Sequence, residues 1–144
     1  MPETKDAKRV ESHIPFIKTK AGYFDHERWD VYHAALELVV LISEVVEQLP
    51  RGKAYLADQL QRAGTSVPLN IAEGAGEHSA NEKARFYRMA KRSATECASI
   101  FDVCTRLRIV DEAQYMRGRE LLLRITAMLT KMARAGVIPA DNPN

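Results

Sequence analysis

Apolar residues recur at helical spacing from residue 25 to residue 49, in two stripes that lie side by side. At 100° per residue the stripes together cover about 220°, whereas a helix with one core face needs only somewhat more than about 100°. We predict a helix that begins at an Asp25 N-cap and ends at Leu49, and that lies mid-bundle or has a second face against another subunit. The stripes are Val31, Ala35, Leu38, Ile42, Val45 and Leu49, and Trp29, Tyr32, Leu36, Val39 and Val46.

A second apolar pattern runs from Ala54 to about Gly76 and keeps its helical register through Pro68. A proline inside a helix removes one hydrogen bond and crowds the carbonyl four residues earlier. That carbonyl belongs to Gly64, and a threonine and a serine follow it, so this stretch can absorb the distortion. We predict one helix with a kink at Pro68, and not two separate helices.

Two further helices are indicated by their N-terminal signals. Ser79 and Glu82 form a capping box for a helix that reaches about Arg108. Asp111 is the N-cap of a last helix that ends near Ala135, with a glycine at 136 as its C-cap. The predicted buried faces are Phe86, Met89, Ala90, Ser93, Cys97, Ile100, Cys104 and Leu107 in the third helix, and Tyr115, Leu121, Leu122, Ile125, Met128, Leu129 and Met132 in the fourth.

Because the connections between the four helices are short, neighbouring helices are expected to run antiparallel. The predicted fold is an all-α, antiparallel, up-down four-helix bundle with a Pro-kinked second helix, over residues 25–137. Residues 1–24 are polar, lack periodicity and are predicted to form a flexible N-terminal arm, and residues 138–144 a C-terminal tail.

Composition places the chain among ordinary single-domain proteins, with 144 residues, 46% apolar and 28% charged. No apolar run approaches the roughly 20 residues of a membrane span, so we expect no membrane association. Cys97 and Cys104 lie seven residues apart on one predicted helix, which separates them by roughly 10 Å and prevents them from pairing. They are interpreted as small core residues in a protein of the reducing cytoplasm.

Charge is distributed unevenly behind the net value of +2. Residues 1–49 carry six Lys/Arg against nine Asp/Glu, and residues 50–144 carry fifteen against ten. The basic excess lies on one face of the third helix and in a heptad row on the fourth, where it permits contact with nucleic-acid phosphates. The candidate residues are Arg85, Arg88, Lys91, Arg92, Arg106, Arg117, Arg124 and Lys131.

The alternative interpretation of these charges is a solvated helix face with local ion pairs, such as Asp102 with Arg106. No known RNA-binding signature accompanies them, and Tyr87 is the main candidate for an exposed aromatic that stacks on a base.

A second set of polar residues lies near the predicted core and is interpreted as a buried hydrogen-bonded network that fixes register or oligomeric state. A metal site between helices is the alternative, but that chemistry needs paired Glu-x-x-His motifs, which the chain lacks. Phosphate-loop and nucleophile motifs are also missing, so we expect no enzyme, no metal, no cofactor and no small-molecule substrate. The network candidates are Gln59, Asn70, Glu73, Arg85 and Glu96.

The most specific motif is the ordered segment Ser66-Val67-Pro68-Leu69-Asn70-Ile71-Ala72-Glu73-Gly74. It lies between Asp58-Gln59-Leu60-Gln61-Arg62-Ala63 and a helix with Ala84-Arg85-Phe86, and the first helix opens with Trp29-Asp30-Val31-Tyr32. Over about residues 25–135 these segments resemble the four-helix-bundle proteins encoded within intervening sequences of 23S ribosomal RNA genes. More distantly, they resemble the accessory variability proteins of diversity-generating retroelements.

This resemblance implies a bacterial four-helix bundle that assembles as a homopentamer. It also implies a link to RNA, since the retroelement proteins bind RNA together with a reverse transcriptase. Two hypotheses follow for this chain. The first is a non-enzymatic, homo-oligomeric accessory or adaptor protein that binds RNA or DNA. The second is a scaffold that binds protein partners and has no nucleic-acid role.

Overall fold

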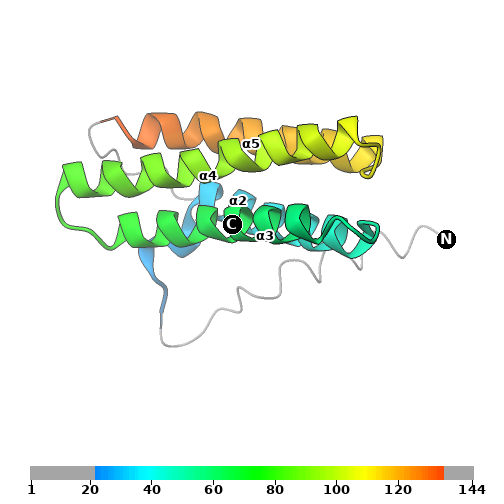
Figure 1. The fold of residues 1–144 in the computed structure, drawn as a ribbon. Helices are drawn as coiled ribbons and strands as arrows, with labels where there is room; N and C mark the ends of the chain where they lie inside the picture. The colour runs from blue at the N-terminus through cyan, green and yellow to red at the C-terminus, as the bar shows by residue number, and fades with distance from the viewer. Residues whose placement is uncertain (1–21, 135–144) are drawn as a thin grey trace.

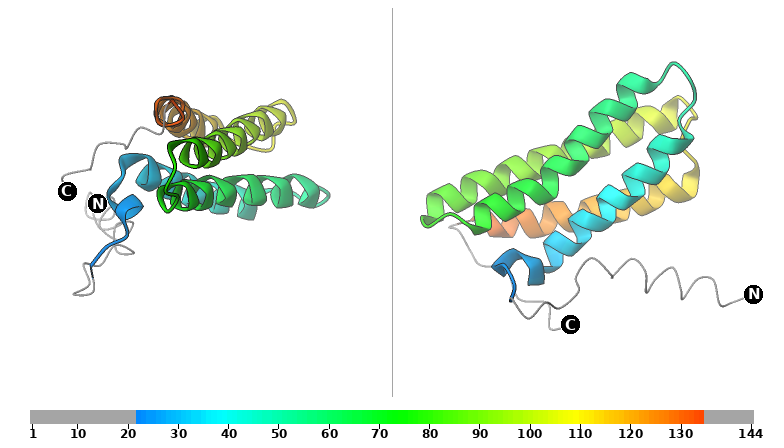
Figure 2. Two further views of the ribbon diagram at one scale, coloured as in Figure 1. Left: turned by 90° about the vertical axis from the view of Figure 1, so that its left-hand side faces the viewer. Right: turned by 90° about the horizontal axis from the view of Figure 1, so that it is seen from below.

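Four long helices make up almost all of the described chain, residues 22–134 of the computed structural model (Figure 1). A short 3-10 turn, η2 (Asp25–Arg28), precedes α2 (Asp30–Gln48), α3 (Ala54–Ala75), α4 (Ala80–Arg106) and α5 (Glu112–Met132). Each helix contacts the next in the chain, and α2 also contacts α5, so the four helices close into a bundle (Figure 2). The predicted up-down four-helix bundle is confirmed. The predicted arm, apart from residues 22–24, the tail and the glycine cap at position 136 lie outside the described residues.

The first helix begins later than predicted, because Trp29 interrupts it. The backbone of Trp29 is extended, with φ −77° and ψ 133°, so the proposed Asp25 N-cap is wrong and α2 starts at Asp30. This break lets the indole turn inward, where it is buried and packs edge-on against Tyr87 with ring centroids 6.4 Å apart. A helix that continued through Trp29 would lose this large apolar contact. The free energy gained by burying an aromatic side chain is larger than that of one additional helical turn.

Helix α3 continues through Pro68 as one helix, as predicted, and the kink itself stays a prediction. Gly64, whose carbonyl loses its usual partner at Pro68, is buried where α3 crosses α2. A Cβ added at Gly64 would collide with Cδ1 of Ile42, so this glycine also permits the close approach of the two helices.

The buried face of α4 is confirmed only in part. Ala90, Cys97, Ile100 and Cys104 are buried as predicted, and the other four predicted residues are not. Met89 and Leu107 are exposed, and Phe86 and Ser93 are only half-buried. Tyr87 is 1% exposed, so the prediction that it stacks on bases is wrong. The physical reason is that Tyr87 and Phe101 bring larger apolar surfaces, with alanines between them that let neighbouring helices approach. The buried residues are Ala84, Tyr87, Ala90, Ala94, Cys97, Ile100, Phe101 and Cys104.

The N-caps of the last two helices are confirmed. Ser79 Oγ accepts from the Glu82 backbone N–H at 3.1 Å, and Asp111 Oδ1 accepts from the Gln114 N–H at 2.7 Å. The Glu82 carboxylate, however, pairs with Arg85. The predicted core stripe of α5 is largely confirmed: Leu121, Leu122, Ile125, Leu129 and Met132 are buried, and Tyr115 and Met128 are half-buried.

Substitution at Gly74 tests the contact between α3 and α4. An added Cβ would lie 2.6 Å from Cε1 of Tyr87 and 3.1 Å from Cβ of Phe86, and the buried Tyr87 ring has no room to move away. We expect Gly74→Ala to lower the free energy of unfolding by about 1–3 kcal/mol, measured by urea denaturation. Gly76→Ala is the matched control, because its nearest neighbours are at 3.6 Å or more, and it should be neutral or slightly stabilising. Equal stability of the two variants would contradict this account of the contact.

Candidate nucleic-acid interface

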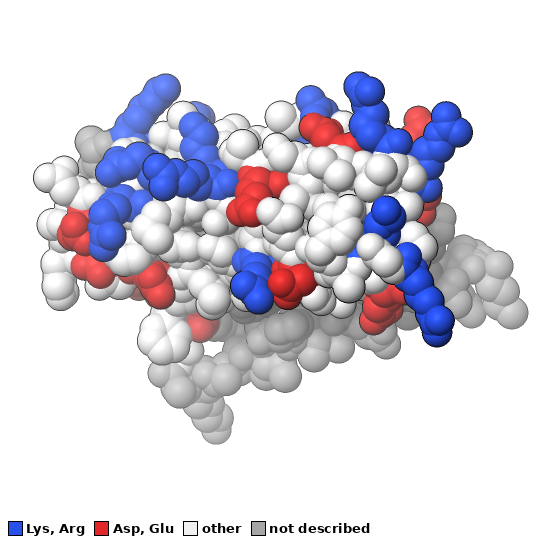
Figure 3. Space-filling model, viewed as in Figure 1, with Lys and Arg blue, Asp and Glu red and all other residues white. Residues whose placement is uncertain are grey.

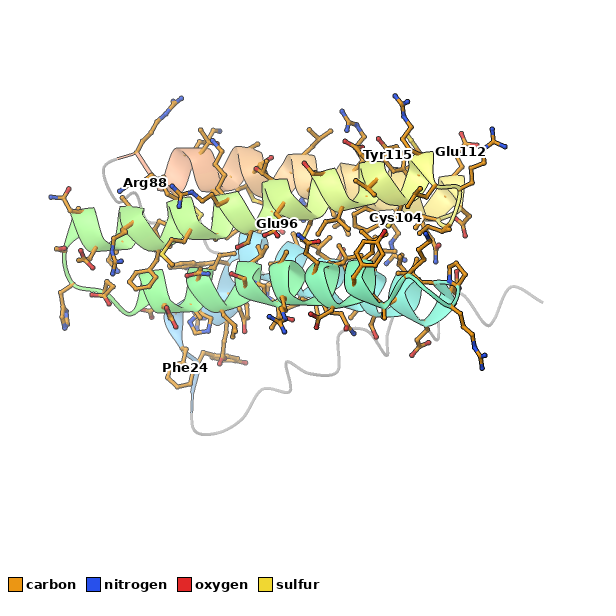
Figure 4. All side chains as sticks on the ribbon, in the orientation of Figure 1. Phe24, Arg88, Glu96, Cys104, Glu112 and Tyr115 are labelled. Atoms are coloured by element: carbon orange, nitrogen blue, oxygen red, sulfur yellow. The ribbon has the colours of Figure 1, made fainter. Side chains whose placement is uncertain are left out.

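The clearest basic surface lies on the N-terminal half of α4. Arg88 and Arg92 are exposed one helical turn apart, and Lys91 is half-buried beside them. Lysine and arginine side chains gather over this part of the helix at the left of Figure 3, and Figure 4 labels Arg88 among them. Ion pairs within residues 22–134 involve only the cations of Arg62, Arg85 and Arg124. Arg88, Lys91 and Arg92 are therefore unneutralised at ion-pair distance, and we call these three residues the α4 basic cluster.

Two predicted members of this surface differ from the cluster. Arg85 pairs with Glu82, with Nη2 3.2 Å from Oε2, and its guanidinium lies 4.8 Å from the centroid of the Phe86 ring. Arg106 lies at the other end of α4, beyond the acidic Glu96, which Figure 4 labels part-way along the helix. Asp102 accepts a hydrogen bond from the Tyr115 hydroxyl at 2.9 Å, and no ion pair joins it to Arg106. The local pair offered as the alternative interpretation is therefore not formed.

The heptad row on α5 does not extend the α4 basic cluster. Arg117, Arg124 and Lys131 are all exposed, but Arg124 Nη2 bonds Asp30 Oδ1 of α2 at 3.0 Å. Arg124 therefore lies on the side of α5 that faces α2, where Asp30 offsets its charge. The candidate basic residues form two separate surfaces, on α4 and along the α2–α5 seam.

The predicted polar network forms only around Asn70. The Asn70 amide donates to the Ser66 carbonyl oxygen at 2.8 Å and to Ser66 Oγ at 2.9 Å, and Ser93 Oγ donates to Ser66 Oγ at 2.8 Å. Gln59, Glu73, Arg85 and Glu96 are exposed, so a buried network of these residues within one chain is wrong. Charged side chains remain hydrated where no buried partner compensates the loss of water.

Ser66 and Ser93 were missed as network members, although Ser66 belongs to the motif quoted above. Their contact joins α3 to α4 and depends on the rotation of α4, which periodicity alone did not establish. A shallow, open hollow lies over this cluster between the two helices, with Met89, Arg92 and Glu96 at its margin. Its polar base is satisfied by internal hydrogen bonds, which suits a structural role.

Both cysteines are buried free thiols in the core of α4. Burial raises the pKa of the Cys97 thiol to about 12, with a smaller contribution from the Glu96 carboxylate, and burial also raises the pKa of Cys104. Their thiolate forms are therefore scarce at neutral pH. No three side chains of His, Cys, Asp or Glu in residues 22–134 are grouped so that they could hold a metal ion.

None of the helices in the described part of the chain combines the length and apolar character that a membrane span needs.

The sequence model of the 23S rRNA-intervening sequence protein family matches residues 27–131. The chain belongs to this family. The match covers all of α2, α3 and α4 and all but the last residue of α5.

A solved structure shares the fold of this 23S rRNA-intervening sequence protein. It is a crystal structure, at 1.70 Å resolution, of a protein of unknown function from the S23 ribosomal protein family of Bacteroides thetaiotaomicron. The two chains are 22% identical, with a TM-score of 0.67, over 72% of this chain and 98% of the other. At this identity the likeness shows the fold alone. No curated protein matches the chain.

Thiol labelling tests the burial of the cysteines. At pH 8 a thiol with a pKa of about 12 holds roughly a thousandfold less thiolate than one with the ordinary value of 9.0. We expect the native protein to react far more slowly with a disulfide reagent such as Ellman's reagent than the same protein in denaturant, where both thiols should react at once. Labelling at equal rates in the two conditions would contradict the burial of these thiols.

Proposed function

We propose that this protein is a non-enzymatic accessory or adaptor protein that assembles as a homopentamer and binds RNA through the α4 basic cluster. The observation that carries the proposal is the set of cations at Arg88, Lys91 and Arg92, which have no carboxylate of residues 22–134 at ion-pair distance. Family membership supports the link to RNA, since the family takes its name from sequences within a ribosomal RNA gene. Two buried free thiols suit a cytoplasmic location.

Assembly multiplies a modest charge on each chain. Lysine and arginine side chains that neutralise phosphates release counterions, and each additional contact raises affinity at low salt. Three unneutralised cations in one chain give weak binding. When the same cations are repeated around a ring, one extended RNA strand can contact several of these clusters at once. Self-assembly and RNA binding are therefore linked in this proposal.

The outer side of α2 supports self-assembly. Of the second apolar stripe predicted for this helix, Trp29 is buried, but Tyr32, Leu36, Val39 and Val46 are only half-buried. Val40, between them, is 51% exposed. Tyr32 and Val46 pack against the core of their own chain, so the apolar surface available to another subunit is formed by Leu36, Val39 and Val40.

A scaffold that binds another protein is the second candidate. It is favoured by an apolar groove of about 160 Å³ between α4 and α5, whose rim includes an exposed leucine at position 123. On this hypothesis the groove would bind a helix of another protein, and RNA would not bind.

RNA binding across a salt series tests the leading proposal. We expect affinity for a mixed-sequence single-stranded RNA to fall steeply as salt rises, and to be weaker with a shallower slope in an Arg88→Glu, Arg92→Glu variant. Loss of two phosphate contacts should reduce the slope of log K against log salt by about 1.4 per chain bound. Fluorescence anisotropy with a labelled RNA measures both quantities.

The matched control is an Arg51→Glu, Arg108→Glu variant, which makes the same change in net charge at the opposite end of the bundle. It should retain most of the wild-type slope. Equal losses in the two variants would indicate attraction by net charge alone and would exclude the α4 basic cluster as the site. Absence of RNA binding at low salt would leave the scaffold hypothesis.

Oligomeric state is a separate test. Native mass spectrometry and sedimentation velocity at micromolar concentration should give a mass five times that of the 16.2 kDa chain. A Val40→Asn variant should shift the distribution of oligomers toward monomer, because it places a polar amide in the proposed apolar interface. A monomer at all concentrations would remove the self-assembly part of the proposal.

A further inference from the structure

We infer that the outer face of α2 in one copy of the chain docks into the groove between α4 and α5 of a second copy. This inference rests on the self-assembly proposed above and specifies its two contact surfaces. It is drawn from the chemistry of the groove, the charge of α2 and the separation of the two surfaces on the bundle.

The groove is largely apolar because its polar side chains, Arg119 apart, are hydrogen-bonded within the chain. Its base and walls include Ala98, Phe101, Leu122 and Leu123. The hydroxyl of Thr95 donates to the Lys91 carbonyl oxygen at 3.0 Å, and that of Thr126 to the Leu122 carbonyl oxygen at 2.8 Å. Figure 4 labels Tyr115 at this groove, where its hydroxyl is bonded to Asp102.

A space of about 160 Å³ is similar to engineered apolar cavities that take a benzene-sized group, so it admits a valine or leucine side chain. Leu123, on the rim, is 59% exposed, and Met116, one heptad earlier on α5, is 55% exposed. Beyond the groove, this face of α5 therefore leaves two apolar side chains in water, with the charged Arg119 and Glu120 between them. Exposed apolar side chains of this kind suit contact with another helix.

The charges at the groove favour a partner with carboxylates. Arg119 lines the groove without an ion pair, and Asp102, the acid that also lines it, is already bonded to Tyr115. Lys91 lies one helical turn before Thr95 on the same side of α4, so it flanks the groove toward the N-terminal end of the helix. A partner helix would meet a cation on each helix of the groove.

Helix α2 has the complementary pattern. It contains Asp30, Glu37, Glu44 and Glu47 and no lysine or arginine. Asp30 is paired with Arg124 within the chain, and the other three carboxylates are exposed. Val40 lies three residues after Glu37 and four before Glu44, so one face carries an exposed valine between carboxylates. These are the features that the groove would bind: one apolar side chain flanked by acids.

The two surfaces lie on different sides of the bundle. Helix α2 packs against α3 and α5, and the groove lies on the far side of α5, between that helix and α4. A contact between two different surfaces is heterologous, and its repetition builds a ring where the rotation closes. Arg92 lines the hollow on the α3 side of α4, away from the groove, so this docking leaves it accessible to RNA.

Charge reversal tests the docking. An α2 variant (Glu44→Lys, Glu47→Lys) and a groove variant (Lys91→Glu, Arg119→Glu) should each raise the dissociation constant of the assembly at least about tenfold, because like charges then meet. The combined variant carries all four changes, has the net charge of the wild type, and should assemble again. Sedimentation velocity across a concentration series measures all three.

A matched control places an equal reversal on α3. Asp58→Lys, Glu73→Lys changes net charge as much as the α2 variant, at exposed positions outside both surfaces, and should assemble like the wild type. Circular dichroism melts of every variant establish that each remains folded. A Leu123→Asn variant, which alters the groove without changing charge, should also weaken assembly.

The outcomes separate the two proposals. A monomeric wild type would overturn both self-assembly and this docking. An assembled wild type whose α2 and groove variants assemble equally well would overturn the docking alone and leave self-assembly standing. Weakened single variants without recovery in the combined variant would also overturn it, because the two surfaces would then not meet each other.

Discussion

The close contact between α3 and α4 is the constraint on which the rest of the bundle depends. Gly74 has no side chain where the Tyr87 ring crosses α3, and the same ring receives the edge of Trp29. A larger residue at position 74 would displace the tyrosine, and with it the indole that sets the start of α2. The hydrogen bond from Ser93 to Ser66 joins the same two helices farther along the contact, and the Asn70 amide, within α3, holds the Ser66 hydroxyl from the other side.

This contact explains the most specific motif of the chain in physical terms. Pro68 and Asn70 are buried, Ser66 binds Ser93 of α4, and Gly74 admits Tyr87. None of these roles requires a ligand. The motif is therefore accounted for by the geometry of the bundle. The outer faces differ in charge: α2 is acidic and the N-terminal half of α4 is basic.

The sequence predicted elements better than it predicted faces. The starts of α4 and α5 followed from their N-caps, whereas the Asp25 cap was wrong. Pro68 was correctly kept inside α3 because the register of apolar residues continued past it. The buried face of α4 was only half right, because Phe86 and Met89 belong to one apolar stripe and the neighbouring Tyr87 and Ala94 to another. Which stripe is buried depends on how α4 packs against its partner helix. The same rotation of α4 leaves Glu96 and Arg85 exposed to water and brings Ser93 into contact with Ser66.

The contrast between an acidic α2 and a basic α4 supports both RNA binding and the docking of one copy on another. A test of either proposal needs residues that take part in only one of the two contacts. Salt weakens the contacts between cations and RNA phosphates, and it also weakens the contacts between α2 carboxylates and groove cations. If the ring dissociates as salt rises, the measured fall in RNA affinity therefore includes the loss of assembly. Lys91 belongs to both surfaces, and its reversal cannot distinguish them. Arg92 lies outside the groove and Glu47 outside the α4 basic cluster, so each affects one process directly. RNA titrations therefore need to be made where sedimentation shows the assembly intact.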